Sequence, residues 1–312
     1  MTSPCDEPIL RAELTRFVLF PIRYAELWNM YKLAQASFWT PADIDLSCDA
    51  VQWKELLTID ERSLMSTVLA FFAASDGIVV ENLATRFCGE VQIAEARCFY
   101  GYQIMIENVH AETYSMLVQA LISDVEEQYR LFSALSTMPS VKAKADWCLR
   151  WINAPEIDFA TRLVAFAIVE GIFFSSSFAV IFWFKSRGLL PGLCMSNELI
   201  ARDEGLHTLF ACVLMNHLQR KAPFDAVRTM ISEAVQLEQR FFEAALPRSL
   251  NGMTAALMHD YVEYVGDFLL RELGFPAIYG KRNPFPFMET TAVGGRANFF
   301  ERGVSDYIGA AV

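Results

Sequence analysis

Apolar side chains recur at intervals of three and four residues almost everywhere between Ala25 and Leu273, and stretches that alternate at every second residue are scarce. This period matches one face of an α-helix rather than one face of a β-strand. The sequence therefore predicts an all-α protein built as a bundle of long helices. Glycine and proline, 15 and 12 of 312 residues, are too few for a loop-rich or sandwich-like chain.

Capping and helix-breaking residues divide this pattern into successive helices without a domain break, so we expect a single domain over 1–312. Thr58 and Glu61 predict a capping box at the start of one long helix. Pro191 is expected to prevent continuation of a helix that stops at Gly188. The expected helices cover 58–87, 90–122, 155–188, 196–219, 224–246 and 253–273. Residues 1–19 precede the pattern, and 274–312 are expected to be mostly irregular.

The charge and the cysteines exclude several classes of protein. The 37 acidic residues outnumber the 26 basic ones, so no basic face is available for nucleic acid. Seven cysteines without a Cys-x-x-Cys pair indicate reduced thiols, and 1–11 lack the features of a secretory signal, so we expect a cytoplasmic protein. The most apolar segment, 163–184, is interrupted by Glu170 and is too short to span a membrane. It is expected to be a buried core helix.

Two of the four histidines carry a glutamate three residues earlier, in Glu107-Asn-Val-His110 and Glu204-Gly-Leu-His207. Residues three apart share one face of a helix, so each pair can bind one metal ion. Such pairs also arise by chance. Whether these two pairs bind metal therefore depends on the other acidic residues of the chain.

Asp76 and Glu170 lie within the apolar segments 68–80 and 163–174. A buried carboxylate must be protonated, strongly hydrogen-bonded or paired with a cation. For either residue alone, a neutral core acid is the alternative. Together with the two Glu-x-x-His pairs, however, they complete the ligand set of di-iron and di-manganese four-helix bundles. Four carboxylates and two imidazoles suit iron or manganese better than a tetrahedral zinc site.

Tyr114 follows His110 by four residues and Glu107 by seven, so it shares their helical face. A tyrosine one turn beyond a metal ligand can lose an electron and a proton when the metals react with oxygen. The alternative is a core tyrosine with a satisfied hydroxyl. Phe174 and Phe178 are expected to form a dry pocket around it, although their spacing is also typical of an ordinary core.

At these residues the sequence closely resembles the small, radical-generating subunit of class I ribonucleotide reductase, in its eukaryotic and viral form. The resemblance extends from Phe20 to Glu301. It is carried by the segments 20–24, 36–40, 70–77, 95–101, 169–175 and 197–207. The resemblance implies a ferritin-like bundle with a di-metal carboxylate site in a four-helix core. Its implied ligands of two iron ions are Asp76, Glu107, His110, Glu170, Glu204 and His207, with manganese or a mixed pair as the alternative.

The resemblance also implies roles that spacing does not reveal. Tyr114 matches the tyrosine that holds a stable radical, and Trp39 matches a tryptophan that relays an electron between the subunit surface and the metals. Asp203 matches an aspartate that links this tryptophan to a metal-bound histidine, here His110. Tyr307 matches a tyrosine that passes the radical onward. Without the resemblance, Trp39 is a core or interface aromatic residue and Asp203 is part of a surface pair with its neighbouring arginine.

The implied function is oxygen activation at a di-iron centre, which oxidises Tyr114 to a radical that is passed to a large catalytic subunit. There a ribonucleoside diphosphate loses its 2′-hydroxyl to give a deoxyribonucleotide. This chain has no G-x-x-x-x-G-K loop and no Rossmann fingerprint, so its own sequence indicates no nucleotide site. Helices that are apolar around most of their circumference favour a homodimer.

Two departures from the family bear on this expectation. The chain stops five residues after Tyr307, without the C-terminal peptide that docks the family's small subunit on the large one. The N-terminal extension typical of animal members is nearly absent. Three alternatives follow: the sequence is truncated, the protein pairs differently with the large subunit, or it no longer serves a large subunit. The alternatives in function are a ferritin-like di-metal oxidase that exports no radical, and a metal-storing or structural helical subunit.

Overall fold

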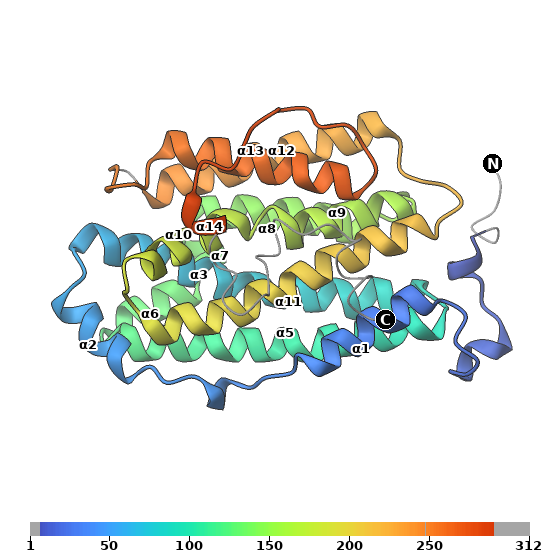
Figure 1. The fold of residues 1–312 in the computed structure, drawn as a ribbon, viewed down its shortest axis with the longest axis horizontal. Coiled ribbons are helices and arrows are strands. Elements are labelled where there is room, and N and C mark those ends of the chain that lie inside the picture. Colours follow the sequence, from blue (N-terminus) through green and yellow to red (C-terminus); the bar gives the residue numbers. More distant parts are fainter. Residues whose placement is uncertain (1–6, 247, 290–312) are drawn as a thin grey trace.

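The computed structural model describes residues 7–246 and 248–289, which form a bundle of helices (Figure 1). In this part of the chain the only β feature is an isolated bridge between Leu250 and Met253. The predicted all-α class is therefore confirmed. The α-helices are α1 (Ala25–Ala36), α2 (Ser47–Glu55), α3 (Ile59–Asn82), α4 (Cys88–Glu90), α5 (Ala94–Leu121), α6 (Val125–Phe132), α7 (Ala134–Thr137), α8 (Pro139–Asn153), α9 (Phe159–Gly171), α10 (Ser175–Ser186), α11 (Pro191–Asn216), α12 (Phe224–Ala245), α13 (Ala255–Glu272) and α14 (Pro286–Glu289).

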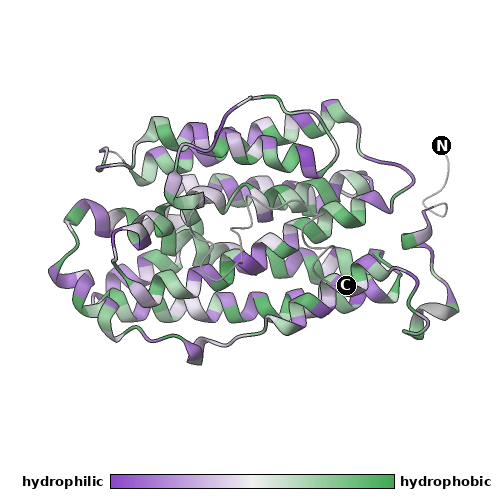
Figure 2. Cartoon of the chain, in the orientation of Figure 1, coloured by the Kyte–Doolittle hydropathy of each residue, from purple (hydrophilic) through white to green (hydrophobic). Residues whose placement is uncertain are grey.

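Four helices, α3, α5, α9 and α11, form the centre of the bundle. Helix α3 packs on α5, α9 packs on α11, and α5 also contacts α11. Helix α1 lies against α5, while α12 and α13 pair with each other on the opposite side (Figure 1). Hydrophobic residues gather in the middle of the bundle, and the outer helices carry more hydrophilic ones (Figure 2). Every residue of α9 is buried, so any charged side chain on it must find a partner inside the protein.

The predicted capping box begins α3. Thr58 Oγ1 accepts a hydrogen bond from the backbone N–H of Glu61, and Glu61 Oε2 accepts one from the N–H of Thr58 at 2.7 Å. The α-helix ends at Asn82 and continues as a π-helical segment over Leu83–Phe87. Thr58 therefore fixes the start of the helix that carries Asp76.

The single helix expected over 155–188 is wrong. The chain instead forms α9 and α10, separated by a turn at 172–174. Lys144 from α8 donates a hydrogen bond to the carbonyl oxygen of Phe173 at 2.6 Å, and Glu238 from α12 accepts one from the N–H of Ser176 at 3.1 Å. These two side chains replace the backbone partners that a continuous helix would supply. The turn begins directly after Gly171, next to Glu170.

Pro191 begins α11 rather than only ending the preceding helix, so this helix starts five residues earlier than expected. Leu190 before it adopts a left-handed conformation with φ of 52°. Asp49 from α2 accepts hydrogen bonds from the N–H groups of Gly192 and Leu193, at 3.0 and 2.8 Å. A proline at the first helical position loses no hydrogen bond, and the distant Asp49 caps the first turn.

Two helical segments are long and apolar enough to be considered as membrane spans, namely Ile59–Glu90 and Phe159–Ser186. In the most apolar 18-residue window of the second segment all residues are buried, and in that of the first segment 56% are buried. Segment 163–184 is buried throughout. The expectation of a buried core segment is therefore confirmed, with the break at 172–174 as the one difference.

Residues 274–285 contain no helix, and α14 follows them. Residues 290–312 and 1–6 lie outside the described part of the chain, and so does Tyr307. The single domain over 1–312 therefore stays a prediction.

Candidate metal centre

The six predicted ligands lie on the four central helices and face one another across the bundle core. Each has at most 2% of its surface exposed. They are Asp76 on α3, Glu107 and His110 on α5, Glu170 on α9, and Glu204 and His207 on α11. Four carboxylates gathered without water require compensation by protons or cations.

Glu107 and Glu204 lie between the two histidines. Glu107 places Oε2 at 3.4 Å from His110 Nδ1 and Oε1 at 3.0 Å from His207 Nδ1. Glu204 places Oε1 at 3.0 Å from His110 Nδ1 and Oε2 at 3.1 Å from His207 Nδ1. Each carboxylate therefore offers one oxygen to each imidazole. Glu107 and Glu204 would therefore be the residues shared by two cations if a pair of ions bound here.

The remaining carboxylates complete the centre on two sides. Glu170 joins Glu107, Glu204 and His207 in a group whose ligand atoms all lie within 4.8 Å of one another. Asp76 and His110 fall outside this group. The charges of Glu107, His110 and Glu204 act on the Asp76 carboxyl group, so Asp76 belongs to the same cluster of charged side chains.

Several ligand atoms of this centre are buried without a hydrogen bond in the described part of the chain. They are Asp76 Oδ2, both carboxylate oxygens of Glu107, Glu170 Oε2 and His110 Nδ1. Buried polar atoms without partners are rare because each costs about 1–3 kcal/mol. Divalent cations between Glu107 and Glu204 would satisfy these atoms and balance the carboxylate charge. The residues present therefore fit a pair of metal ions.

The pKa values show how strongly these groups depend on one another. Burial raises the pKa of Asp76 and of Glu170 well above the usual carboxyl range, and the neighbouring carboxylates raise both further. Burial lowers the pKa of His207, but the carboxylates of Glu107 and Glu204 beside its ring outweigh this and raise the pKa to about 9. The site thus holds protons tightly, and a bound cation must displace them.

Tyr114 is fully buried beside the centre. Its ring stacks on Phe72 with a centroid distance of 4.4 Å and an interplanar angle of 4°, and its hydroxyl donates a hydrogen bond to Asn197 Oδ1 at 2.9 Å. Phe174 and Phe178, predicted to form a dry pocket around Tyr114, pack on the Phe72 ring, with Phe174 stacked at 5.6 Å and Phe178 tilted at 5.1 Å. Burial raises the pKa of Tyr114 well above its usual value, and the nearby carboxylates add to this.

Trp39, Asp203 and His110 form one hydrogen-bonded row. Trp39 Nε1 donates to Asp203 Oδ2 at 2.8 Å, and the same oxygen lies 3.2 Å from His110 Nε2. Asp203 is only 4% exposed. This burial excludes the alternative that Asp203 and Arg202 merely form an ion pair on the protein surface. Arg202 binds Asp203 Oδ1 at 3.0 Å and the carbonyl oxygen of Ser37 at 2.6 Å, so it ties Asp203 to the segment that carries Trp39.

Three residues at the centre are not indicated by the sequence. Gln103 donates a hydrogen bond to Glu170 Oε1 at 2.8 Å, Asn197 accepts one from Tyr114, and Phe72 stacks on Tyr114. Gln103 precedes Glu107 by four residues, and Asn197 precedes Glu204 by seven. A search for polar residues on the ligand face of each helix would have found both.

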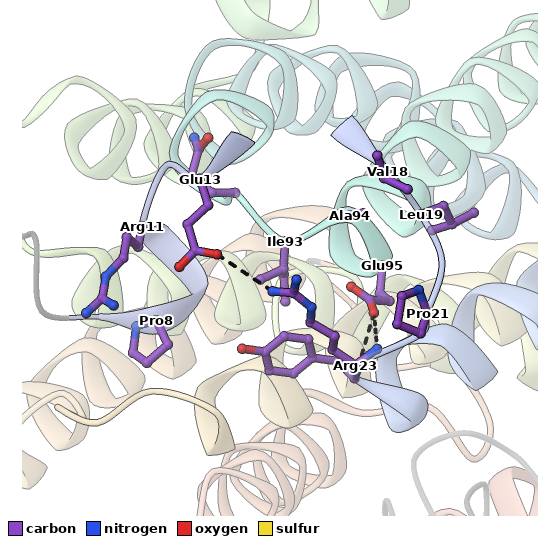
Figure 3. A pocket seen from close by; sticks show the side chains of 12 residues that line it. Pro8, Arg11, Glu13, Val18, Leu19, Pro21, Arg23, Ile93, Ala94 and Glu95 are labelled. Atoms are coloured by element: carbon purple, nitrogen blue, oxygen red, sulfur yellow. Dashed lines mark hydrogen bonds and ion pairs between the residues drawn. The ribbon is translucent and has the colours of Figure 1, made fainter. Parts of the chain in front are cut away.

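A hollow of about 110 Å³ lies at the N-terminus of α5, lined by residues that include Arg11, Glu13, Arg23 and Glu95 (Figure 3). Arg23 Nη1 lies 3.7 Å from Glu13 Oε2, and Glu95 Oε1 accepts a hydrogen bond from the N–H of Arg23 at 2.6 Å. None of the six predicted ligands lines it. This polar hollow is therefore separate from the candidate metal centre.

The fold and the buried cluster of carboxylates and imidazoles are those of the helical di-metal carboxylate class of proteins, and Tyr114 is buried in the same core. The family model described as "Ribonucleotide reductase, small chain" matches residues 16–284. The chain is 56% identical over 302 residues to ribonucleoside-diphosphate reductase subunit M2 of Homo sapiens, covering 97% of this chain and 77% of the relative. It is 55% identical over 301 residues to the small chain of vaccinia virus (strain Ankara), covering 96% and 94%.

Among solved structures, the Rnr4 homodimer of ribonucleotide reductase from Saccharomyces cerevisiae superposes with a TM-score of 0.85 at 39% identity, covering 97% of this chain and 93% of that chain. The chain therefore belongs to the ribonucleotide reductase small-chain family. The resemblance to the eukaryotic and viral small subunits and the ferritin-like fold are both confirmed, and the chain is an oxidoreductase of this family.

Proposed function

We propose that this chain generates and stores a tyrosyl radical on Tyr114 for a large ribonucleotide reductase subunit. In this proposal two iron ions bind to the six buried ligands. The observation that carries the proposal is the position of Glu107 and Glu204, each of which offers one oxygen to each histidine. Manganese or a mixed pair suits the same ligands and is the alternative.

Iron ions held by these ligands supply the reaction with oxygen that removes one electron from Tyr114. The protein's own residues prepare the tyrosine for this loss. Its raised pKa keeps the phenol protonated, so an electron can leave only together with a proton if the product is to be neutral. Phe72 covers one face of the ring, and complete burial excludes water and reductants that would quench a radical.

Trp39, Asp203 and His110 are proposed to carry the electron between the centre and the subunit surface. Asp203 holds the Trp39 indole and the His110 imidazole through one oxygen. A carboxylate in this position orients a metal-bound imidazole and increases its basicity. Tyr307 is proposed as the next residue towards the large subunit, which would hold the ribonucleotide.

Loss of Glu204 is expected to have a larger effect on metal binding than loss of Glu170. Glu204 faces both histidines, whereas Glu170 belongs to the His207 side only. Glu204→Ala should therefore bind less than about one metal ion per chain, and Glu170→Ala should lose or weaken one of two. Metal content after loading with Fe(II) and gel filtration measures both.

The control for these variants is Asp225→Ala, which removes an exposed carboxylate from the start of α12. It should retain two ions per chain. Two ions retained in Glu204→Ala would count against the proposed ligands and thereby against the metal centre itself.

Trp39→Phe tests the relay separately from the metals. The variant loses the hydrogen bond to Asp203, and we expect it to keep two metal ions while nucleotide reduction with a large subunit falls to background. Trp53→Phe removes another buried indole, on α2, and should be fully active. Equal activity of wild type and Trp39→Phe in this assay would remove Trp39 from the proposed route.

We further propose that the protein is a homodimer in the cytoplasm. A homodimer is supported by the 39%-identical Rnr4 structure, which was solved as one. Cytoplasmic location is supported by the six cysteines of the described residues, all of which have free thiols. The row of Trp39, Asp203 and His110 favours radical export over a ferritin-like oxidase or a metal-storage protein, because neither of those needs it.

A further inference from the structure

Asn197 on α11 connects the candidate radical site with the helix that carries Glu204. Its Oδ1 accepts the hydrogen bond from the Tyr114 hydroxyl at 2.9 Å. Both side chains have no exposed surface. Asn197 therefore determines the polar environment of the Tyr114 oxygen, next to the stacked ring of Phe72.

The contacts of Asn197 Nδ2 fix the orientation of the side-chain amide. Asn197 Nδ2 donates a hydrogen bond to the carbonyl oxygen of Leu193 at 2.9 Å and lies 3.4 Å from Ser196 Oγ. Turning the amide by 180° would place Oδ1 against the Leu193 carbonyl oxygen, leaving two acceptors with no proton between them. Towards Tyr114, Asn197 is consequently a hydrogen-bond acceptor only.

We propose that Asn197 is a positioning residue that stabilises the reduced phenol of Tyr114 and thereby makes the oxidised tyrosine a stronger oxidant. The inference rests on the proposed function of Tyr114. Oxidation of Tyr114 removes one electron from the ring and one proton from the hydroxyl. Iron ions held by the six ligands would accept the electron after reacting with oxygen, and a carboxylate of the same cluster, whose charges act on Tyr114, would accept the proton. The O–H bond breaks, and the tyrosyl oxygen can then only accept hydrogen bonds. It faces Asn197 Oδ1, which also only accepts.

The hydrogen bond therefore exists in the reduced state and is lost in the oxidised state. An amide oxygen is too weakly basic to keep the proton at neutral pH. The net contribution of one hydrogen bond corresponds to a roughly 2- to 12-fold change in the equilibrium between the two states. This bias favours transfer of the radical away from Tyr114.

Asn197→Leu tests the proposal, because leucine has a similar volume and no acceptor. Asn82→Leu is the matched control, since Asn82 is another buried asparagine, on α3, whose Oδ1 accepts no hydrogen bond from the described residues. Protein loaded with Fe(II) and oxygen is mixed with a small one-electron reductant, and the tyrosyl signal is followed by electron paramagnetic resonance. The signal of Asn197→Leu should decay about 2- to 12-fold more slowly than that of wild type or Asn82→Leu. Equal decay rates would overturn the proposal.

Two further measurements keep the test decisive. High-field resonance should give wild type and Asn197→Leu the same g1 value, because an amide group that only accepts gives the oxidised tyrosyl oxygen no hydrogen bond. A lowered g1 that rises in Asn197→Leu would show that the amide turns to donate, which overturns the proposal.

In metal-free protein, ultraviolet resonance Raman spectra should lose one hydrogen-bonded phenol in Asn197→Leu, or in Asn197→Ala if the leucine variant does not fold. An unchanged Raman spectrum would overturn the inference, whereas absence of any tyrosyl signal in wild type would overturn the proposed function and the inference with it.

Discussion

Replacing Tyr114 by phenylalanine is expected to abolish the tyrosyl signal and to reduce nucleotide reduction to background, while two metal ions stay bound. Phenylalanine keeps the ring that stacks on Phe72 at 4.4 Å, but it has no O–H group from which an electron and a proton can be lost. The change leaves Asn197 Oδ1 without its donor, which costs about 1–3 kcal/mol of stability. Resonance spectra and metal analysis of the same loaded sample measure both expectations.

Tyr100→Phe is the matched control for this variant. Tyr100 lies on the same helix, is also fully buried, and its hydroxyl has no hydrogen-bond partner among the described residues. We expect the control to retain the radical signal and activity. A normal signal in Tyr114→Phe, or its loss in Tyr100→Phe alone, would show that another tyrosine holds the radical.

Breaking the buried ion pair between Lys144 and Glu238 is expected to have the largest effect on stability. The two charged groups lie 2.6 Å apart, and the Lys144 ammonium lies 3.3 Å from the ring centroid of Phe71. Burial lowers the pKa of Lys144 to about 8, and it raises the pKa of Glu238, although each attracts the other. The cost of burying these charges is therefore not fully offset by their attraction.

Glu238→Leu should accordingly lower the free energy of unfolding by about 3–5 kcal/mol, because Lys144 is left buried without its counter-charge. The double variant Lys144→Met with Glu238→Leu buries no charge at this position, and it should be more stable than Glu238→Leu alone. Chemical denaturation of the metal-free proteins measures these differences. If Glu238→Leu were as stable as wild type, the ion pair of Lys144 and Glu238 would not stabilise the turn between α9 and α10.

The residues of the candidate metal centre were recognisable in the sequence because their signal is local. The two Glu-x-x-His pairs follow from helical spacing, and Asp76 and Glu170 stand out as acids in apolar segments. The structure brings all six together in one buried centre. The start of α3 at Thr58 was equally local, because a capping box lies within four residues.

Features that depend on distant partners were not predictable. The break between α9 and α10 needs Lys144 and Glu238, which belong to other helices, and the start of α11 at Pro191 needs Asp49 from α2. The hydrogen bond between Tyr114 and Asn197 likewise joins two helices. Trp39 and Asp203 were indicated only by the resemblance, because nothing in their spacing connects residues so far apart in the chain.

The central claim is that two cations lie between Glu107 and Glu204. Crystals grown with ferrous iron and measured at the iron absorption edge test it most directly. We expect two anomalous peaks, one next to His110 Nδ1 and the other next to His207 Nδ1, with the two carboxylates bridging them. Anomalous density that is absent from this position, while the four central helices are well ordered, would contradict it.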